Sequence, residues 1–399
     1  MKTLLQMSYR ITAVAAIVLL LQQTFPSTSA AGSCDNLNIQ LADFGLRMMR
    51  QSDEKSSAIV SPSSSAIALA MLYVGAMTET KEEIRRVIVG GCDDNALVNY
   101  YSDIMQRMSQ QSTTYTLSLA NRIYTEKSLI LQTKFVEMMK EKFNGEIHTM
   151  DVGKPKEAAK KINDWVRNKT NDKIDKLVDE DDPNLSDIFI VNAIYFNGSW
   201  QFPFDKSETF KEKFYPKKGQ HKMIHTMRIV EFLPFFEDES IKVVALPYKN
   251  GGDISLYVFL PKIRFGLREM ENTLNGSKLL SLAKSCRKSG RVEVRLPKFT
   301  VKTNFPMKSA LQSMGIRRAF SVTAANFGGM CATPTHVRNF IHKALIEVNE
   351  GGTQAAAVSA INMVFKSSKR IRHHFIANHP FLFALIKDET ILFIGHFLK

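Results

Sequence analysis

The stretch EGGTQAAAVSAINMVFKSSKRIRHH occupies residues 350–374, between segments 340–348 and 381–386, whose apolar residues predict two strands. Connections of this length without secondary structure are usually functional or disordered in a compact domain. A disordered tail would carry charges, whereas the first half of this stretch consists mostly of small, uncharged residues. We therefore interpret residues 350–374 as a functional loop.

The first residues of the loop alternate as in a β-strand, which suggests that this segment could become a strand of a sheet. Every second side chain is small, and in an extended chain these side chains would share one face that fits a crowded sheet interior. The glycines before them accept backbone angles that other residues resist, so we expect a pivot there. The alternating residues are Thr353, Ala355, Ala357 and Ser359. The predicted hinge consists of Glu350, Gly351, Gly352, Thr353, Ala355, Ala356 and Ala357.

Around the loop, helices and strands are interspersed. Apolar residues at helical spacing predict helices at residues 35–50, 64–76 and 156–166, the second of them capped by Ser61-Pro62. Strands are predicted at residues 115–124, 187–196, 242–246, 254–260, 292–296, 340–348, 381–386 and 391–397, the last two joined as a buried hairpin. The chain is therefore predicted to have an α+β fold with large sheets.

The N-terminus has the features of a secretory signal peptide. Lys2 and Arg10 precede an apolar run at residues 11–21 that is too short to span a bilayer, and small residues around Ala30 supply a cleavage site. No later run of about eighteen or more apolar residues occurs. We expect residues 1–30 to be removed and residues 31–399 to form one soluble, secreted, extracellular domain, since no linker or shift in composition divides them.

The charge and the cysteines restrict the class of protein less sharply. The formal net charge is +14, and loss of Lys2 and Arg10 with the signal peptide lowers it by two, to +12. Such a charge favours polyanions as partners, and secretion argues against nucleic acid.

The four cysteines are too few for a disulfide framework and lack metal-ligand spacing, so their pairing stays open; they are Cys34, Cys92, Cys286 and Cys331. N-glycosylation sequons begin at Asn168, Asn184, Asn197 and Asn275, of which we expect one or two to be occupied.

Four separated motifs resemble those of the serpin family, in the family's order and across the mature chain. The residues from Glu347 (EVNEGGTQAAA) resemble the hinge of inhibitory members, and those from Phe375 (FIANHPFLF) resemble the C-terminal signature. The residues from Asn192 (NAIYFNGSW) resemble the central strand, and Ser61-Pro-Ser-Ser-Ser with Ala68-Leu-Ala-Met resembles the helix beneath the main sheet. By this resemblance the chain is identified as a member of the family.

The resemblance implies a serpin fold and suicide-substrate inhibition of a serine protease. In such inhibitors the protease acylates itself on a bait residue of the exposed loop, and the cut loop inserts as an extra strand into the main sheet. The protease is distorted before it can deacylate, so the trap is kinetic and is driven by released strain. The implied partner is the protease, held in a covalent complex; we expect the inhibitor itself to be a monomer.

The resemblance also places the bait residue. The family's count of seventeen residues, starting with Glu350, ends at Lys366, so that Lys366-Ser367 would be the cleaved bond. A lysine there would enter an acidic specificity pocket, which predicts trypsin-like proteases as targets. The alternative bait is Arg370, because Lys366-Ser-Ser-Lys-Arg resembles a proprotein-convertase site, although it would lengthen the inserting strand by four residues.

Other residues take structural roles by resemblance. Glu350 is expected to face Lys298. Gly351 stands where serpins commonly carry a charged residue and is expected to loosen the hinge, while Val358 ends the alanine run early and would face outward after insertion. A hydrogen-bond cluster where the main sheet parts is expected from Ser61, Ser64, Asn192 and His342.

No catalytic or metal motif accompanies these features. The sequence contains no His-Glu-x-x-His, Cys-x-x-Cys, Gly-x-Ser-x-Gly or phosphate loop, so we expect no enzyme activity, no metal and no cofactor. In this family a basic helix can bind heparin-like glycosaminoglycans, and a helix continuing past residue 284 would align basic side chains on one face; the alternative is a solvated face with the helix ended by Gly290. The candidate polyanion-binding residues are Lys278, Lys284, Arg287, Lys288 and Arg291.

The main alternative function comes from a different class: a non-inhibitory serpin-fold carrier or signalling protein whose loop is cut without inserting. The small, uncharged hinge Thr353-Gln-Ala-Ala-Ala favours the inhibitor, because a bulky or charged residue at positions 353, 355 or 357 would oppose insertion. Neither a membrane nor nucleic acid is expected as a partner.

Overall fold

The structure is a computed structural model that describes residues 37–88, 93–110, 112–180, 182, 185–249, 254–353 and 370–399. Several predicted features lie outside the described residues: the signal peptide, Cys34, Cys92, Asn184, the hinge alanines Ala355, Ala356 and Ala357, and the bait bond Lys366-Ser367.

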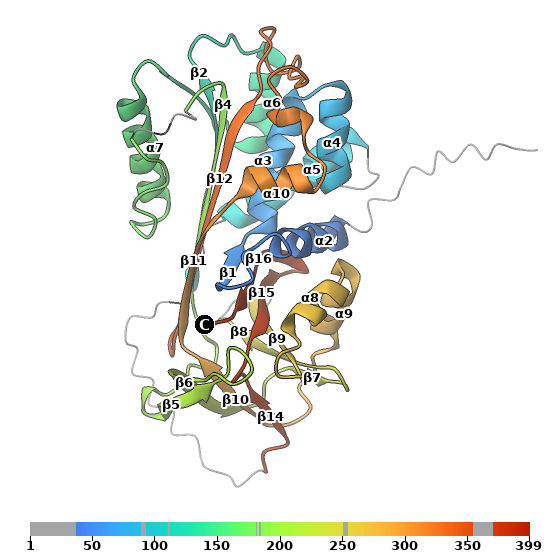
Figure 1. The fold of residues 1–399 in the computed structure, drawn as a ribbon, viewed down its shortest axis with the longest axis vertical. Helices are drawn as coiled ribbons and strands as arrows, with labels where there is room; N and C mark the ends of the chain where they lie inside the picture. Colours follow the sequence, from blue (N-terminus) through green and yellow to red (C-terminus); the bar gives the residue numbers. More distant parts are fainter. Residues whose placement is uncertain are drawn as a thin grey trace, which may run out of the picture.

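One of the two six-stranded sheets, called the main sheet, contains β11, β12, β4, β2 and β3 in that order, with β13 paired to the end of β4. Figure 1 labels β11, β12, β4 and β2 of this sheet. Strands β12 and β4 run parallel, whereas β4 and β2 run antiparallel. The bounds are Phe299–Phe305 (β11), Val337–Val348 (β12), Ile188–Ser199 (β4), Tyr115–Glu126 (β2), Ile147–Met150 (β3) and Gly352–Thr353 (β13).

The central strand β4 is buried on both faces, because a helix covers each face of the sheet. Its even-numbered residues, such as Ile194, belong to the same apolar core as α3 (Pro62–Gly75). Its odd-numbered residues, such as Val191, pack in a smaller core with α7 (Pro155–Lys169), on the opposite side of the sheet in Figure 1. This double cover explains the near-continuous apolar run at residues 187–196.

Two further sheets complete the fold. The C-terminal sheet has the order β1-β16-β15-β9-β8-β7, and the predicted hairpin β15–β16 is confirmed, with Lys387 opposite Thr390 at its turn. The third sheet has the order β14-β10-β6-β5, so β5 is an edge strand. The bounds are Ala58–Val60 (β1), Thr390–Phe397 (β16), Phe381–Lys387 (β15), Ile254–Pro261 (β9), Ile241–Pro247 (β8), Phe235–Glu237 (β7), His373–Ile376 (β14), Val292–Pro297 (β10), Lys222–Glu231 (β6) and Thr209–Phe214 (β5).

The remaining helices surround the sheets. They are α2 (Leu37–Met49), α4 (Thr78–Ile88), α5 (Asp94–Ser109), α6 (Thr133–Phe143), α8 (Leu267–Thr273), α9 (Gly276–Ser285), α10 (Met307–Ser313) and the short 3-10 helices η2 (Lys206–Glu208) and η3 (Arg318–Phe320). The predicted α+β class with large sheets is confirmed, as is the cap of α3, where the Ser61 side chain accepts the Ser64 N–H. Within the described residues, no helix combines the length and apolar character needed to cross a membrane.

Candidate functional site

The place where a loop could enter the main sheet is the boundary between β12 and β4, called the seam. The two parallel strands pair directly, with Ile341 opposite Val191 and Ile346 opposite Phe196. At these positions the main sheet is closed, so an entering strand would first have to break these pairs.

The hinge lies at one end of the seam. After β12 ends at Val348, the chain turns through residues 349–351 and returns as β13. β13 is antiparallel to β4, with Gly352 opposite Ser199 and Thr353 opposite Gly198. The chain thus starts back along β4 in the direction that an inserting strand would take.

The close approach of β13 to β4 requires glycine at position 352. The φ angle of Gly352 is 138°, and a Cβ there would lie 2.0 Å from the carbonyl oxygen of Gly198. Gly351 is not among the described glycines with positive φ. Its N–H donates to Asn349 Oδ1 (3.1 Å), and its carbonyl accepts the Trp200 N–H (3.0 Å). Of the two predicted pivot residues, Gly352 is therefore the one whose backbone demands glycine.

Glu350 anchors the hinge to two neighbouring segments, and its predicted contact with Lys298 is present. Lys298 Nζ lies 2.9 Å from Glu350 Oε2, and Thr209 Oγ1 donates to Glu350 Oε1 (3.1 Å). The Glu350 carbonyl accepts the Phe204 N–H (2.9 Å). Burial opposes ionisation of the carboxyl, but the hydrogen bond and charge of Lys298, with hydrogen bonds from the Glu350 backbone N–H and from Thr209, outweigh it and lower the pKa of Glu350. The carboxylate therefore stays charged and holds the hinge in place at neutral pH.

Trp200 supports the hinge turn from the side of β4. Its Nε1 donates to the Asn349 carbonyl (2.8 Å), and its ring stacks on Tyr248 at a centroid distance of 4.4 Å. Because Trp200 follows directly after β4, this bond ties the end of β4 to the turn after β12 across the end of the seam.

Polar side chains form a row across the seam, one on each of three adjacent strands. The register places Asn192 of β4 opposite His342 of β12 and opposite Asn121 of β2. From α3, Ser64 Oγ donates to Asn121 Oδ1 (3.0 Å) and accepts from Asn192 Nδ2 (2.7 Å). The Ser61 N–H donates to His342 Nε2 (3.1 Å). These five residues are called the seam cluster.

The bond between His342 and Asn192 crosses the seam and fixes the tautomer of the imidazole. Since Nε2 of His342 accepts the Ser61 N–H, the proton sits on Nδ1, which donates to Asn192 Oδ1. His342 is fully buried, and burial lowers its pKa to about 3, so the ring is neutral at physiological pH. A strand entering the seam must separate His342 from Asn192, although a role for the cluster in sheet opening stays a prediction.

The lowered pKa of His342 predicts a pH-dependent stability. In the unfolded chain His342 binds a proton below about pH 6.5, whereas in the folded chain it does so only below about 3. Stability is thus complete above pH 6.5 and falls between pH 6.5 and 3, by about 1.4 kcal/mol on going from pH 7.5 to 5.5. Urea unfolding of wild type and His342→Gln at both pH values measures this. Between pH 7.5 and 5.5, the free energy of unfolding of His342→Gln should fall by about 1.4 kcal/mol less than that of the wild type. An equal fall in both proteins would contradict the assigned pKa of His342.

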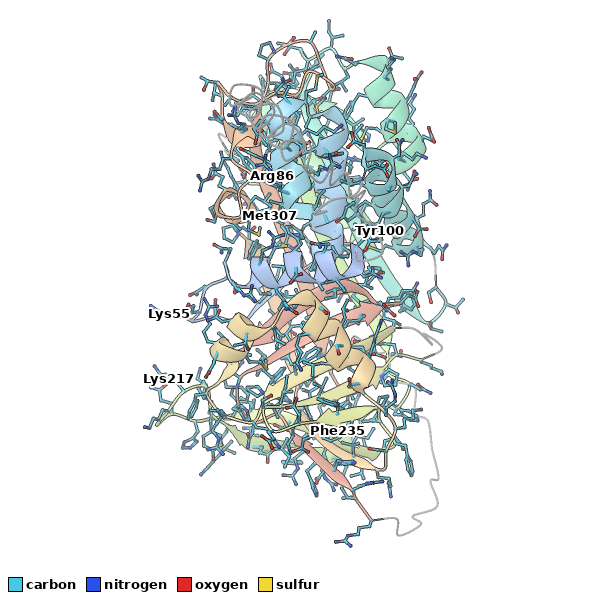
Figure 2. All side chains as sticks on the ribbon, turned by 90° about the vertical axis from the view of Figure 1, so that its right-hand side faces the viewer. Lys55, Arg86, Tyr100, Lys217, Phe235 and Met307 are labelled. Atoms are coloured by element: carbon cyan, nitrogen blue, oxygen red, sulfur yellow. The ribbon has the colours of Figure 1, made fainter. Side chains whose placement is uncertain are left out.

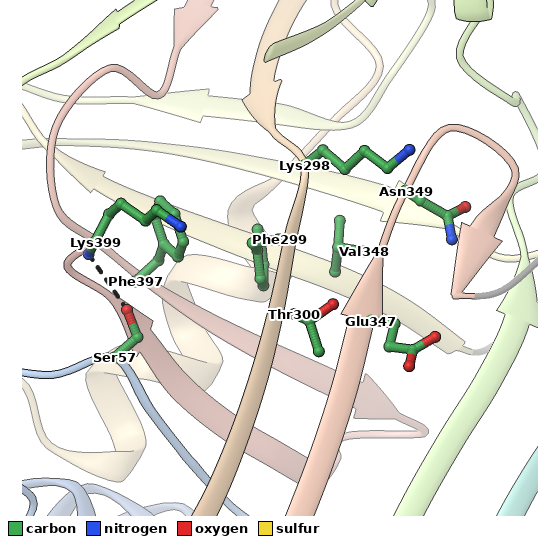
Figure 3. A pocket seen from close by; sticks show the side chains of 9 residues that line it. All are labelled: Ser57, Lys298, Phe299, Thr300, Glu347, Val348, Asn349, Phe397 and Lys399. Atoms are coloured by element: carbon green, nitrogen blue, oxygen red, sulfur yellow. Dashed lines mark hydrogen bonds between the residues drawn. The ribbon is translucent and has the colours of Figure 1, made fainter. Parts of the chain in front are cut away.

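A cavity of about 410 Å³ borders the hinge (Figure 3). It lies between the adjoining ends of β11 and β12 and the C-terminus, whose Lys399 N–H donates to Ser57 Oγ (3.3 Å). Glu347, Val348 and Asn349 line it directly before the hinge glutamate. The end of β12 is therefore not closely packed on this side.

The other end of the loop is fixed to the third sheet. Arg370 is exposed, and two residues later the Arg372 N–H donates to the Arg291 carbonyl (3.0 Å). β14 then pairs in parallel with β10. The predicted bait region thus lies in the chain between β13, which pairs with the end of β4, and β14, at the edge of the third sheet.

The candidate polyanion-binding residues do not align on one helical face, because α9 ends at Ser285, and polyanion binding by them stays a prediction. Cys286 has the extended backbone of a C-cap, and the next residue, Arg287, forms a β-bridge with Phe235. Lys284 pairs with Glu389 at 2.9 Å. The Arg287 guanidinium donates to the carbonyl of Cys286 (3.1 Å), and that of Arg291 donates to the carbonyl of Val230 (3.1 Å). The five basic residues therefore do not share one helical face.

The described sequons and cysteines differ in accessibility. Asn168 is exposed at the end of α7, and Asn275 is exposed as the N-cap of α9. Asn197 is half-buried within β4. Cys286 and Cys331 are both free, buried thiols.

The sequence analysis missed three residues of the site. Asn121 completes the seam cluster, while Thr209 and Trp200 hold the hinge. An asparagine inside the predicted strand at 115–124 was a usable signal, since asparagine is disfavoured in strands. Thr209 gave no signal, because its partner Glu350 is 141 residues away.

Comparisons with known proteins agree with this architecture. The serpin (serine protease inhibitor) family profile matches residues 39–399. Human serpin B3 is 31% identical over 376 residues, covering 89% of this chain and 96% of its own, and Iripin-2 of Ixodes ricinus is 32% identical over 368 residues, covering 89% and 91%. The native structure of tengpin, a thermophilic serpin, matches with a TM-score of 0.83 at 25% identity, covering 92% and 94%. Human thyroxine-binding globulin complexed with its ligand matches with a TM-score of 0.82 at 23% identity, covering 91% and 98%.

The closed main sheet, the hinge and the family profile together define the class. The chain belongs to the serpin family, whose members are mostly protease inhibitors and typically bind proteases. The family also includes members without inhibitory function, and the likeness to thyroxine-binding globulin shows the fold alone.

Proposed function

We propose that this protein is a secreted suicide-substrate inhibitor of trypsin-like serine proteases, with Lys366-Ser367 as the cleaved bond. It acts as an inhibitor and not as an enzyme, because the protease supplies all the chemistry of acylation. Insertion of the cut loop between β12 and β4 then outpaces deacylation and traps the protease.

The observation that carries the proposal is the register of β13. Gly352 lies opposite Ser199 and Thr353 opposite Gly198, antiparallel to β4. A strand growing in this register would place Ala355 opposite Phe196, Ala357 opposite Ile194 and Ser359 opposite Asn192.

These β4 positions are the even-numbered ones that face α3. The small residues of the loop would therefore meet the already filled core beneath α3, where large or charged side chains have no room. The residues between them, Gln354, Ala356 and Val358, would face the side covered by α7.

The seam cluster supplies a barrier that insertion must overcome. Entry of the strand breaks the bond from His342 to Asn192 and brings Ser359 opposite Asn192, where its hydroxyl would offer a replacement partner. The proposed strand thus compensates for the polar contact that it breaks.

The described end of the loop supports Lys366 over Arg370 as the bait. Arg370 lies two residues from Arg372, whose N–H and guanidinium are bound to the carbonyls of Arg291 and Ser289. A protease needs an extended substrate segment on both sides of the cleaved bond, and this anchoring restricts the segment after Arg370 more than that after Lys366.

Secretion and glycosylation belong to the proposal. The N-terminal segment supports secretion through its charged start, short apolar run and small residues at the cleavage site. Of the described sequons, the exposed Asn168 and Asn275 are proposed as the glycosylated ones, because a glycan needs a solvent-facing amide.

Incubation of the purified mature protein with trypsin tests the proposal. We expect a covalent adduct that survives denaturing electrophoresis, and mass spectrometry should find a released peptide that starts at Ser367. Cleavage without an adduct across a panel of trypsin-like proteases would instead support the non-inhibitory carrier or signalling protein.

A further inference from the structure

The connection between β9 and α8 exposes two large apolar side chains. Ile263 is 70% exposed and Phe265 is 45% exposed. Eight large apolar side chains are exposed in the part of the chain that the structure describes, and only these two belong to the same connection. Single exposed apolar residues are common on protein surfaces, whereas neighbouring ones indicate a contact surface. Residues 262–265 (Lys-Ile-Arg-Phe) are called the apolar loop.

Hydrogen bonds at both ends of the apolar loop fix its conformation. The Lys262 N–H donates to the Ser240 carbonyl (2.8 Å), and Lys262 Nζ pairs with Glu237 at 2.9 Å. The Gly266 N–H donates to the Ile263 carbonyl (2.9 Å), which closes a turn directly before α8. A loop held in this way presents its side chains without first having to become ordered, so little conformational entropy would be lost on binding.

Positive charge lies next to the two apolar side chains. Between them in the chain, the Arg264 guanidinium lies over the ring of Tyr215, 4.3 Å from the ring centroid. Tyr215 follows directly after β5, and the turn from β5 to β6 continues with the exposed Lys217 and Lys218. Among the described residues, none of these three cations forms an ion pair. They are therefore free to contact an anionic surface.

The turn with the two lysines projects from the molecule. Figure 2 shows Lys217 at the periphery, on the same side as Lys55. Glu54, the neighbour of Lys55, pairs with Arg268 of α8 at 2.7 Å. The start of α8, which directly follows the apolar loop, is therefore found on this side as well. A flat partner could reach the apolar loop and the turn together.

The combination of apolar and cationic side chains restricts the kind of partner. Lysines in a turn need no partner, because solvated surface charges keep a protein soluble. A purely polar polyanion would leave Ile263 and Phe265 in water, and a purely apolar protein surface would leave the three cations unpaired. A bilayer with anionic headgroups satisfies both, since it presents negative charge directly above an apolar interior.

We propose that the apolar loop docks this protein on the surface of a membrane that contains anionic lipids. Ile263 and Phe265 insert at the boundary between headgroups and acyl chains, and the three cations contact the headgroups. The chain then lies on the bilayer and does not span it. The sequence alone predicts no membrane partner, since nothing in it shows that these two side chains are exposed in the fold.

Flotation of the purified mature chain with lipid vesicles tests the proposal without any protease, so its failure is separable from failure of the inhibitor function. One set of vesicles contains phosphatidylcholine and phosphatidylserine in equal parts, and the other contains phosphatidylcholine alone. The test variant is Ile263→Ser with Phe265→Ser. The matched control is Ile130→Ser with Val322→Ser, which removes two apolar side chains that are also exposed.

The control residues lie far from the apolar loop. Ile130 lies three residues before α6, and Val322 follows η3, whose neighbour Arg317 donates its N–H to Glu83 of α4 (2.7 Å). Figure 1 shows α4 and α6 well separated from α8. All four substituted side chains are exposed, so both variants should unfold at the wild-type temperature in a thermal melt.

We expect the wild type to float with the phosphatidylserine vesicles and to bind those of phosphatidylcholine alone more weakly. Complete burial of one large apolar side chain contributes a factor of about 10 to 150 in affinity, but only the exposed parts of these two can insert. The apparent dissociation constant should therefore rise roughly 10- to 100-fold in the test variant and stay unchanged in the control. Lys217→Gln with Lys218→Gln should raise it roughly 25-fold, since each lysine near an anionic surface contributes about fivefold.

Three results would overturn the proposal. Wild type that stays in solution with both kinds of vesicle would leave the exposed apolar pair to a protein partner. Wild-type binding by the test variant, with loss only in the lysine variant, would show simple adsorption of cations to the headgroups. Equal losses in the test variant and its control would show that the apolar loop is not the docking site.

Discussion

Replacement of Thr353 by arginine is expected to convert the protein from an inhibitor into a substrate. Thr353 pairs with Gly198 of β4, one of the even-numbered positions that face α3. A Cβ at Gly198 would meet Tyr248, Phe196 and Tyr115 within 3.2 Å, so this region has no space for a guanidinium.

The charge of that arginine would also be unfavourable. Lys387 Nζ already donates to Tyr115 Oη (2.9 Å), so a second cation would meet a like charge nearby. In the uncut protein Thr353 is the last residue of β13, whereas after insertion it would lie inside a strand that continues on both sides, so the arginine could no longer turn away from the core. A buried, unpaired charge costs about 3–5 kcal/mol, which corresponds to insertion slowed by roughly 100-fold or more. Deacylation of the protease would then be faster than insertion of the loop, and the protease would be released.

The measurement is the number of inhibitor molecules consumed for each trypsin molecule inactivated. It should rise from near one in wild type to roughly 100 in Thr353→Arg, with cleaved inhibitor accumulating on the gel. The control is Gln354→Arg, which by the period of two faces the other side of the sheet and should still trap the protease. Complexes formed by Thr353→Arg at the wild-type stoichiometry would show that this position does not enter the core.

The regular elements of this fold could be predicted because their signals are local. The run at 187–196 is apolar at nearly every position, and the hairpin at residues 381–397 has two apolar runs around a short polar turn. The cap of α3 is readable from Ser61-Pro62 alone. Each of these depends on neighbours within a few residues.

The end of α9 and the partners of the hinge could not be predicted in the same way. Basic residues at helical spacing continue after Ser285, but Arg287 forms a β-bridge with Phe235, which lies 52 residues earlier in the chain. Asn121 likewise becomes part of the seam cluster only because β2 pairs with β4 at Asn192. The local pattern can mark Asn121 as unusual for a strand, but it does not identify the distant segment with which either residue pairs.

Replacement of Lys366 by alanine is expected to slow inhibition of trypsin strongly while leaving the insertion mechanism intact. The ammonium of the bait residue enters a pocket whose carboxylate is left unpaired when the side chain is truncated. Loss of one partner of such a buried charge pair costs about 2–5 kcal/mol, so the rate of complex formation with trypsin should fall by a factor between roughly 30 and 4,000.

Inhibition of a different protease by Lys366→Ala would show that the variant is folded and has changed only its target. Alanine fits the small specificity pocket of elastase-like proteases, so Lys366→Ala should form a denaturant-resistant adduct with such an enzyme. Lys366→Arg should retain the trypsin adduct, because arginine supplies the same charge. Arg370→Ala should behave as wild type, because position 370 lies next to the anchored Arg372.

Mass spectrometry of the released peptide decides between the two bait positions. A peptide that starts at Ser367 places the cleaved bond after Lys366, at the end of a strand long enough to fill the seam from Thr353 onward. A peptide that starts at Ile371, with undiminished inhibition by Lys366→Ala, would assign the bait to Arg370. The inserting strand would then be four residues longer, and Arg372 would have to leave its contacts with Arg291 and Ser289 before a protease could bind.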